Sequence, residues 1–269
     1  MKILDRAAIL LLNLCLLFTA ILIPALSIAK SPSYFQSAFE KTGLYERIGE
    51  DGNHYRSVIR YVNGDKDAAA LLSDEQLNAI AQHIISYIRG DTESFELYMD
   101  EVYLNGSYTD GVRIFGDAAI SHMEDVRTLV NAAEIFAAIL ACLLPCLLLY
   151  LILRRKELGH LVLRYTLFFY ATLLLFAVLF VLVTLVLDGG EYGLVRALWR
   201  NIHYFLFPFR PDKVNASFFD DALTYILRVD LFMNAVYIIL GILTAALSLF
   251  TAMAIGMKRC APKEGKTTE

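Results

Sequence analysis

The sequence predicts a mainly α-helical, polytopic membrane protein with four transmembrane helices and a small extracytoplasmic α/β domain between the first two. Three observations support this fold class. The 269 residues are 57% hydrophobic with a mean hydropathy of +0.52, four apolar stretches are long, and basic residues collect beside only some of their ends. A helix of about 20 apolar residues crosses the roughly 30 Å hydrocarbon core. Such a composition excludes an ordinary soluble domain.

The apolar stretches and their flanking charges predict the topology. The segments in chain order are helix 7–29, extracytoplasmic domain 30–128, helix 129–153, helix 161–187, extracytoplasmic loop 188–230 and helix 231–257. The flanking basic residues are Lys2, Arg6, Arg154, Arg155, Lys156, Arg164, Lys258, Arg259, Lys263 and Lys266. The positive-inside rule places these residues, and hence both termini, in the cytoplasm.

The first helix has two alternative fates. Its basic start and the small-x-small sequence Ser27-Ile28-Ala29 resemble a signal peptide with its cleavage site. The apolar run is longer than a typical signal core, so we expect the helix to be retained as an anchor. Cleavage stays open, and it would leave the topology of the later helices unchanged.

The extracytoplasmic domain shows helix and hairpin signals. A capping-box sequence at Ser73 and apolar residues at helical spacing predict a helix to about Arg89. Loosely alternating segments at 95–104 and 108–115 flank Asn105-Gly106, which is a strong hairpin turn signal. A further helix is expected to start near Gly116-Asp117 and to continue into the second span.

The four cysteines argue against thiol chemistry outside the cell. Cys15, Cys142 and Cys146 fall within the expected spans, and Cys260 falls in the expected cytoplasmic tail. The extracytoplasmic segments therefore offer no thiol for a disulfide or a nucleophile, which argues against a four-span thiol oxidase. Cys142 and Cys146 share a helix face, but without further ligands a packing role is expected rather than a metal site.

The predicted topology sorts the five histidines. His160 lies in the basic connection, whereas His54 and His83 are expected to be exposed or capping residues of the outer domain, without nearby partners. His122 lies about two turns before the second span, hence roughly 10 Å above it, in the headgroup region. Asp125 follows three residues later on the same helix face, where it would orient the imidazole.

His203 lies among aromatic residues in the other outer connection, in a segment broken by Pro208 and Pro211. Such a segment is typical of a half-helix or re-entrant stretch at the membrane interface, and an aromatic belt with an incidental histidine is the alternative. Imidazoles at the outer bilayer surface suit acyl or proton chemistry on a lipid. Metal binding by both histidines with Asp125 or Glu124 is a further alternative, but no compact ligand motif is present, so no metal or cofactor is expected.

Four charged residues are further candidates for the site. Arg196, Arg200 and Arg210 surround His203 and would hold a lipid phosphate or carboxyl group, or else anchor the ends of the spans. Glu134 lies about a turn and a half inside the second span, where an ionisable group usually faces a cavity or a partner, unless it reaches back to the interface.

Two segments carry a recognisable pattern. Residues 121–127 read SHMEDVR, and residues 203–208 read HYFLFP, followed by ALTYIL at 222–227 and by Leu231-Phe232. These segments, with the number and order of spans, resemble a family of bacterial four-span membrane proteins whose characterised members are lipoprotein intramolecular transacylases. The chain departs from the family pattern at Arg127, where Lys is common, at Arg228, where Pro is usual, and in the looser stretch 209–217.

The resemblance implies a function, a site and a location. His122 and His203 fall on the family's catalytic histidine pair. The implied reaction moves the sn-2 acyl chain of the diacylglyceryl group on a lipoprotein's N-terminal cysteine to the α-amino group of that cysteine, forming a lyso-form lipoprotein. The protein would then be an acyltransferase of the bacterial cell membrane, with its active site at the outer leaflet and diacylglyceryl-modified lipoproteins and the bilayer as partners. No nucleic-acid partner is expected.

Two other functions remain alternatives from the residues themselves. A serine lipid hydrolase would use Ser121 or Ser217 as nucleophile, but adjacent residues such as Ser121 and His122 diverge by about 100° around a helix, so a distant histidine would be required. A non-enzymatic accessory or sensor protein would instead bind a partner through the outer domain.

Overall fold

The computed structural model describes residues 3–41, 56–184, 197, 201, 222–227 and 229–259. The chain divides into two compact units, each described by itself. The helical unit consists of Met1–Leu26, Ala133–Gly190 and Val236–Glu269. The mixed unit consists of Ser27–Ala132 and Glu191–Ala235.

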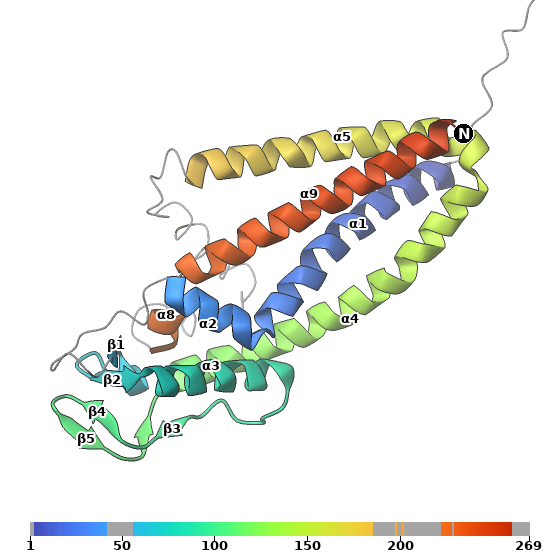
Figure 1. The fold of residues 1–269 in the computed structure, drawn as a ribbon. Helices are drawn as coiled ribbons and strands as arrows, with labels where there is room; N and C mark the ends of the chain where they lie inside the picture. The colour runs from blue at the N-terminus through green and yellow to red at the C-terminus, as the bar shows by residue number, and fades with distance from the viewer. Residues whose placement is uncertain are drawn as a thin grey trace, which may run out of the picture. The chain divides into compact units, whose positions relative to one another are not determined.

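The helical unit contains most of each membrane helix (Figure 1). Helices α1 (Ile3–Ala29), α4 (Asp117–Leu153), α5 (Arg155–Leu182) and α9 (Val229–Arg259) each include a segment long and apolar enough to cross a bilayer. The prediction of four membrane helices is therefore confirmed. The expected continuation of the helix that begins near Asp117 into the second span is also confirmed, because α4 is one unbroken helix of 37 residues.

A polar network joins the ends of three helices in the helical unit. The carboxylate of Asp5 on α1 is buried, with 2% of the residue exposed. It accepts hydrogen bonds from the Tyr150 hydroxyl at 2.8 Å and from the Arg154 guanidinium at 2.5 Å. Arg154 also binds Glu157 at the start of α5. Burial of a carboxylate is costly unless it is paired, and Arg154 supplies the pairing charge.

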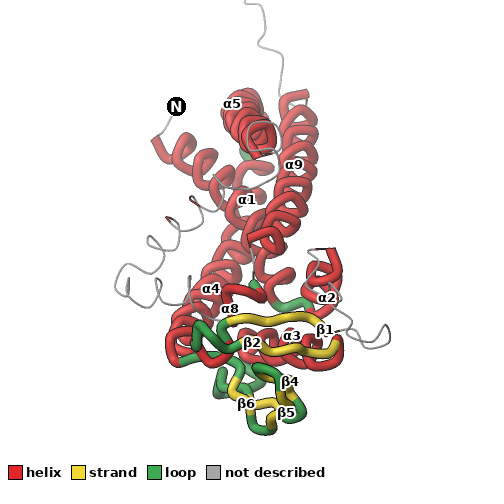
Figure 2. The backbone as a smooth tube through the Cα atoms, turned by 90° about the vertical axis from the view of Figure 1, so that its left-hand side faces the viewer, coloured by secondary structure: helices red, strands yellow, loops and turns green. Residues whose placement is uncertain are grey.

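In the residues that the structure describes, the mixed unit combines helices with two small sheets (Figure 2). Its elements are α2 (Pro32–Lys41), β1 (Arg56–Arg60), the 3₁₀ turn η1 (Val62–Gly64), β2 (Ala69–Ser73), α3 (Asp74–Arg89), β3 (Tyr98–Met99), β4 (Val102–Leu104), β5 (Ser107–Thr109), β6 (Val112–Arg113) and α8 (Ala222–Ile226). The strand order is β1-β2-β4-β5 in one sheet and β3-β6 in the other. The expected mixed α/β character is confirmed, whereas α2 and the β1–β2 hairpin were not expected.

Helix α3 forms where the sequence predicts it. The Ser73 hydroxyl accepts the backbone N–H of Gln76 at 3.2 Å, and the Gln76 side chain accepts the N–H of Ser73 at 2.9 Å. This reciprocal pair satisfies N–H groups that the first turn of a helix leaves without partners. The helix ends at Gly90, whose φ of 89° lies in the left-handed region that favours glycine.

The predicted hairpin forms at Asn105-Gly106, but its strands are interrupted. Both turn residues have positive φ, 49° and 97°, as a two-residue hairpin turn requires. Four short strands replace the two long ones expected, because the pairing breaks at Glu101 and Gly111. Asp100 accepts the N–H of Gly111 at 2.8 Å and Asp110 accepts the N–H of Glu101 at 2.9 Å, so two carboxylates take the place of ladder hydrogen bonds.

An apolar core joins the elements of the mixed unit. Phe95 stacks on Phe115 with ring centroids 4.6 Å apart, and both rings are almost completely buried. His83 of α3 packs against Phe95 and lies 3.1 Å from its carbonyl oxygen through Nε2. The expectation that His83 lacks a nearby partner is therefore wrong. His54 lies outside the described residues.

The cysteines of α4 differ from expectation in their packing. Cys15 on α1 is buried, but Cys142 and Cys146 are both exposed along α4. The expected packing role is therefore wrong for this pair within the chain, since their side chains face away from the helices that the structure describes.

Candidate functional site

His122 occupies the second turn of α4 and is buried, with 7% of the residue exposed. Its neighbours along the helix, Ala119 and Met123, pack in the apolar core of the mixed unit. An imidazole held in a folded core has few orientations available, which is the condition that positioned proton transfer requires. Burial therefore distinguishes His122 from an incidental surface histidine.

The acidic residues that follow His122 lie in different surroundings. Asp125 is half-buried and lies three residues further along α4, so the two side chains share a face of the helix. Glu124 is exposed. Asp125 thus has the placement for orienting the imidazole, while Glu124 lies toward solvent at the surface of the helix.

The second expected histidine lies outside the described residues, as do Arg196, Arg200, Arg210 and Ser217. The described segment that follows His203 in sequence is α8. Leu223 and Ile226 of α8 belong to the same apolar core as Ala119 and Met123 of α4. The chain on the C-terminal side of the His203 segment and the helical turns around His122 therefore meet in one core.

Arg127 binds the loop after α3, a role that the sequence did not predict. Its guanidinium donates a hydrogen bond to the Thr92 carbonyl oxygen at 3.0 Å and lies 4.9 Å from the centroid of the Tyr87 ring. A cation over an aromatic face is attracted by the ring quadrupole. Arg127 lies five residues after His122, so these contacts fix α4 to α3 close to the buried imidazole. The partners are 35 and 40 residues away in sequence, and no local pattern indicates them.

Two further ionisable groups lie on or near α4. Glu134 is half-buried. Arg113, just before the helix, binds Asp117 at 2.6 Å and Glu96 at 3.1 Å. The hydrogen bond with Asp117, aided by the charges of both carboxylates, raises the pKa of Arg113 above its usual range. Arg113, at the end of β6, therefore forms ion pairs both with Asp117 at the start of α4 and with Glu96.

Among the residues that the structure describes, no three His, Cys, Asp or Glu side chains lie closely enough together to hold a metal ion. Acid–base chemistry by the buried imidazole is the chemistry that the described arrangement offers, since it combines a titratable group with a carboxylate on the same helix face.

The fold defines a class: a polytopic membrane protein with four membrane helices and a compact α/β unit that contains a buried histidine. The sequence of residues 8–192 matches the model of the family described as lipoprotein intramolecular transacylase Lit. The match covers more than half of the chain, and the chain belongs to this family. It is therefore an acyltransferase of the membrane that transfers an acyl chain within a lipoprotein.

Solved structures agree with the fold. The membrane integral lipoprotein intramolecular transacylase Lit from Bacillus cereus superposes with a TM-score of 0.60 at 10% sequence identity, over 95% of this chain and 96% of that chain. A variant of that protein, in which one histidine is replaced by arginine, superposes with a TM-score of 0.57 at 11% identity, over 95% and 92% of the two chains. No curated protein sequence matches the chain.

Proposed function

We propose that the protein transfers the sn-2 acyl chain of an S-diacylglyceryl lipoprotein to the α-amino group of the same N-terminal cysteine. The amine nitrogen attacks the ester carbonyl carbon, the amide C–N bond forms, and the ester C–O bond breaks. The proton lost from nitrogen ends on the released glyceryl oxygen, and the product is the lyso-form lipoprotein. Nucleophile and ester belong to one molecule, so positioning supplies much of the rate enhancement.

His122 and His203 are the proposed catalytic pair. One imidazole accepts the proton of the attacking amine, while the other polarises the ester carbonyl or protonates the leaving oxygen. Which histidine acts as base stays open. The burial of His122, at 7% exposed, is the observation that carries this proposal. The half-buried Asp125 on the same helix face supports a role in orienting that imidazole.

The other charged candidates have supporting roles in this proposal. Glu124 lies two residues from His122 and Arg200 lies three residues from His203 in sequence, and both would adjust the local charge. Arg196 and Arg210 would bind the polar part of the lipid, where cations attract anionic groups. Glu134, half-buried on the membrane helix, would line the path of the substrate.

The distribution of basic residues supports a topology for this reaction. Lys and Arg at the two termini and around Arg154 support a cytoplasmic location for those regions, and in this proposal the mixed unit lies outside. The substrate, a lipid-anchored protein, reaches the site from the outer leaflet of a bacterial cell membrane.

Expression in a bacterium whose lipoproteins carry a diacylglyceryl group and a free amine tests the reaction. Mass spectrometry of the lipopeptides is expected to show one acyl chain moved to nitrogen, with total lipid mass unchanged. If the acyl chains of the lipoproteins keep their positions in cells that contain abundant, folded protein, the proposal is wrong.

Histidine variants test the catalytic pair. His122→Asn and His203→Asn should each lower conversion by about 100- to 10,000-fold, the usual contribution of a positioned general acid or base. His160→Asn is the matched control, because His160 is exposed in the helical unit. Near-normal conversion by either variant of the pair would remove that residue from the mechanism.

A further inference from the structure

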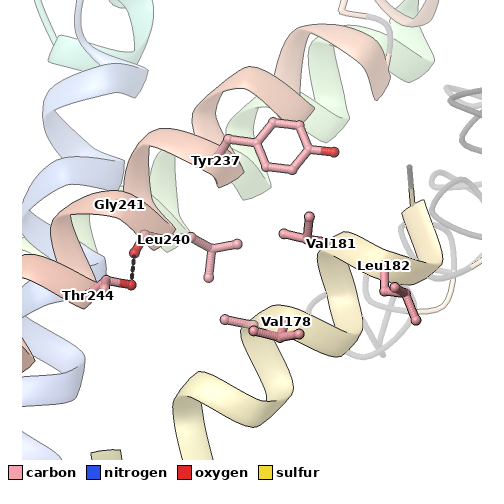
Figure 3. Close-up of a pocket in the computed structure, with 8 residues that line it drawn as sticks. Val178, Val181, Leu182, Tyr237, Leu240, Gly241 and Thr244 are labelled. Atoms are coloured by element: carbon pink, nitrogen blue, oxygen red, sulfur yellow. Dashed lines mark hydrogen bonds between the residues drawn. The ribbon is translucent and has the colours of Figure 1, made fainter. Parts of the chain in front are cut away.

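A groove lies between α5 and α9 in the helical unit, with a volume of about 540 Å³. Figure 3 shows Val178 and Val181 of α5 facing Leu240 and Tyr237 of α9 across it. The volume is within the range of about 300 to 1,000 Å³ that is typical of small-molecule sites. The groove is therefore large enough to take part of a lipid chain.

Hydrogen bonds between hydroxyl groups connect the two helical segments on either side of the groove, one at Tyr237 and one at Tyr170, seven residues before Ala177. The Tyr170 and Ser248 hydroxyls lie 3.0 Å apart on one side, and the Thr184 and Tyr237 hydroxyls lie 3.3 Å apart on the other. The lining residues lie between Ala177 and Leu182 on α5 and between Tyr237 and Thr244 on α9. The longer of these two stretches is about 10 Å long at 1.5 Å per residue. The two hydrogen bonds therefore connect α9 with α5 and with the turn that follows α5, on both sides of the groove.

The wall of the groove is apolar between these hydroxyl pairs. The Thr244 hydroxyl donates to the Leu240 carbonyl oxygen at 2.8 Å, so it is used within its own helix. Val178 and Leu182 are 55% and 47% exposed. A site with apolar walls and a hydroxyl pair at the Tyr237 end fits an amphiphile whose chain lies along the helices and whose polar end lies beyond Tyr237.

We infer that the groove binds one acyl chain of the diacylglyceryl lipoprotein substrate. This inference rests on the proposed function and assigns a place to the substrate's hydrocarbon. In the proposed topology the Tyr237 end of the spans faces outside, where the ester linkages of an outer-leaflet lipid lie. Burial of methylene groups against Val178, Val181 and Leu240 supplies binding energy remote from the reacting atoms, which positions the ester.

Gly241 is a position in the wall of the groove where a larger side chain can be introduced. A Cβ built on Gly241 meets no atom within 4 Å, and Gly241 lines the groove. Gly256 on the same helix is equally open, with no atom within 4 Å of its Cβ, but it does not line the groove. Gly241→Leu therefore narrows the groove, and Gly256→Leu is the matched control for adding the same side chain to the same helix.

The test uses the purified full-length protein in liposomes and synthetic S-diacylglyceryl cysteine lipopeptides with either palmitoyl or octanoyl chains. Gly241→Leu should lower kcat/KM for the palmitoyl lipopeptide by about tenfold or more, the effect of a methylene misfit in an apolar pocket, and should affect the octanoyl lipopeptide less. Gly256→Leu should match the wild type on both. Thermal unfolding checks that each variant is folded. If Gly241→Leu does not fold, Val178→Phe narrows the groove from α5 instead, and Leu175→Phe is its control.

The outcomes of this test distinguish failure of the groove assignment from failure of the proposed function. Equal activity of the wild type and the folded groove variants on the palmitoyl lipopeptide would overturn the inference and leave the proposed function intact. An equal loss on both lipopeptides would also overturn it, because the groove would then be filled by bulk phospholipid or act only in stability. A wild type that converts neither lipopeptide would overturn the proposed function, and the assignment of the groove with it.

Discussion

Gly159 packs directly against the backbone of Met257, and a Cβ added at Gly159 would lie 2.9 Å from the Met257 carbonyl oxygen. Backbone atoms do not move aside as a flexible side chain does. Gly159→Ala should therefore destabilise the protein in detergent by about 1–3 kcal/mol, the usual cost of overpacking, despite the better helix propensity of alanine. Thermal unfolding of the purified protein measures the change.

Gly256→Ala is the control for this substitution. It lies one residue before Met257, and its added Cβ would meet no atom within 4 Å. Removal of a helical glycine should leave stability unchanged or raise it by up to about 1 kcal/mol. Equal effects of the two substitutions would show that the α5–α9 contact does not limit stability.

Loss of the Asp5 carboxylate should destabilise the protein more than loss of the Glu157 carboxylate, although both bind Arg154. Asp5 is buried and also accepts the Tyr150 hydroxyl, whereas the Glu157 side chain is 66% exposed. Exposed ion pairs contribute little, while removal of one partner of a buried pair leaves the other unsatisfied. Asp5→Ala is expected to lower the unfolding temperature by several degrees and Glu157→Gln by little. The reverse order would show that the buried pair is not stabilising.

Arg127→Ala should loosen the loop after α3, because it removes both the hydrogen bond to Thr92 and the contact with the Tyr87 ring. Hydrogen exchange of residues 90–95 should rise in this variant. Arg127→Lys keeps the charge over the ring but not the forked geometry of the guanidinium, so an intermediate effect is expected. Thr128→Ala, which removes only a bond to the Glu124 carbonyl oxygen within α4, is the control. Unchanged exchange in Arg127→Ala would exclude the proposed anchoring.

The hydrogen bonds accepted by Asp100 and Asp110 should stabilise the backbone where the strand pairing of the hairpin is interrupted. Asp110→Ala frees the N–H of Glu101 and Asp100→Ala frees the N–H of Gly111. Each change is expected to cost about 0.5–1.5 kcal/mol locally, measured as faster exchange of the freed amide. The double variant should cost less than the sum of the singles if the two bonds support one geometry, because either single change then already weakens the other bond. Full additivity would show that they act separately.

Local signals in the sequence were sufficient to predict several elements of secondary structure. The capping box at Ser73 and the turn at Asn105-Gly106 depend on residues within a few positions of each other, and both form as predicted. The interruption of the hairpin was not predictable, because Glu101, at a φ of 54°, donates its N–H to the side chain of Asp110, nine residues further along the chain. The mixed unit was therefore predicted by type and not by strand pairing.

The candidate site was predictable to the same extent. The position of His122 in the second turn of α4 follows from helical spacing before an apolar span. Its burial depends on packing among segments far apart in sequence, including α8, and no periodicity encodes that packing. The groove between α5 and α9 was also missed, because hydropathy identifies spans but not the spacing between them.

The placement of the cysteines makes topology directly measurable. Cys15 is buried within α1, and the exposed Cys142 and Cys146 lie within α4, so all three belong to helices that are long and apolar enough to cross a bilayer. Between residues 16 and 141 the chain contains no thiol. If the mixed unit lies outside as proposed, a single cysteine introduced there, for instance at the exposed Ser107, should be labelled in intact cells by a membrane-impermeant maleimide, with little labelling of the native thiols.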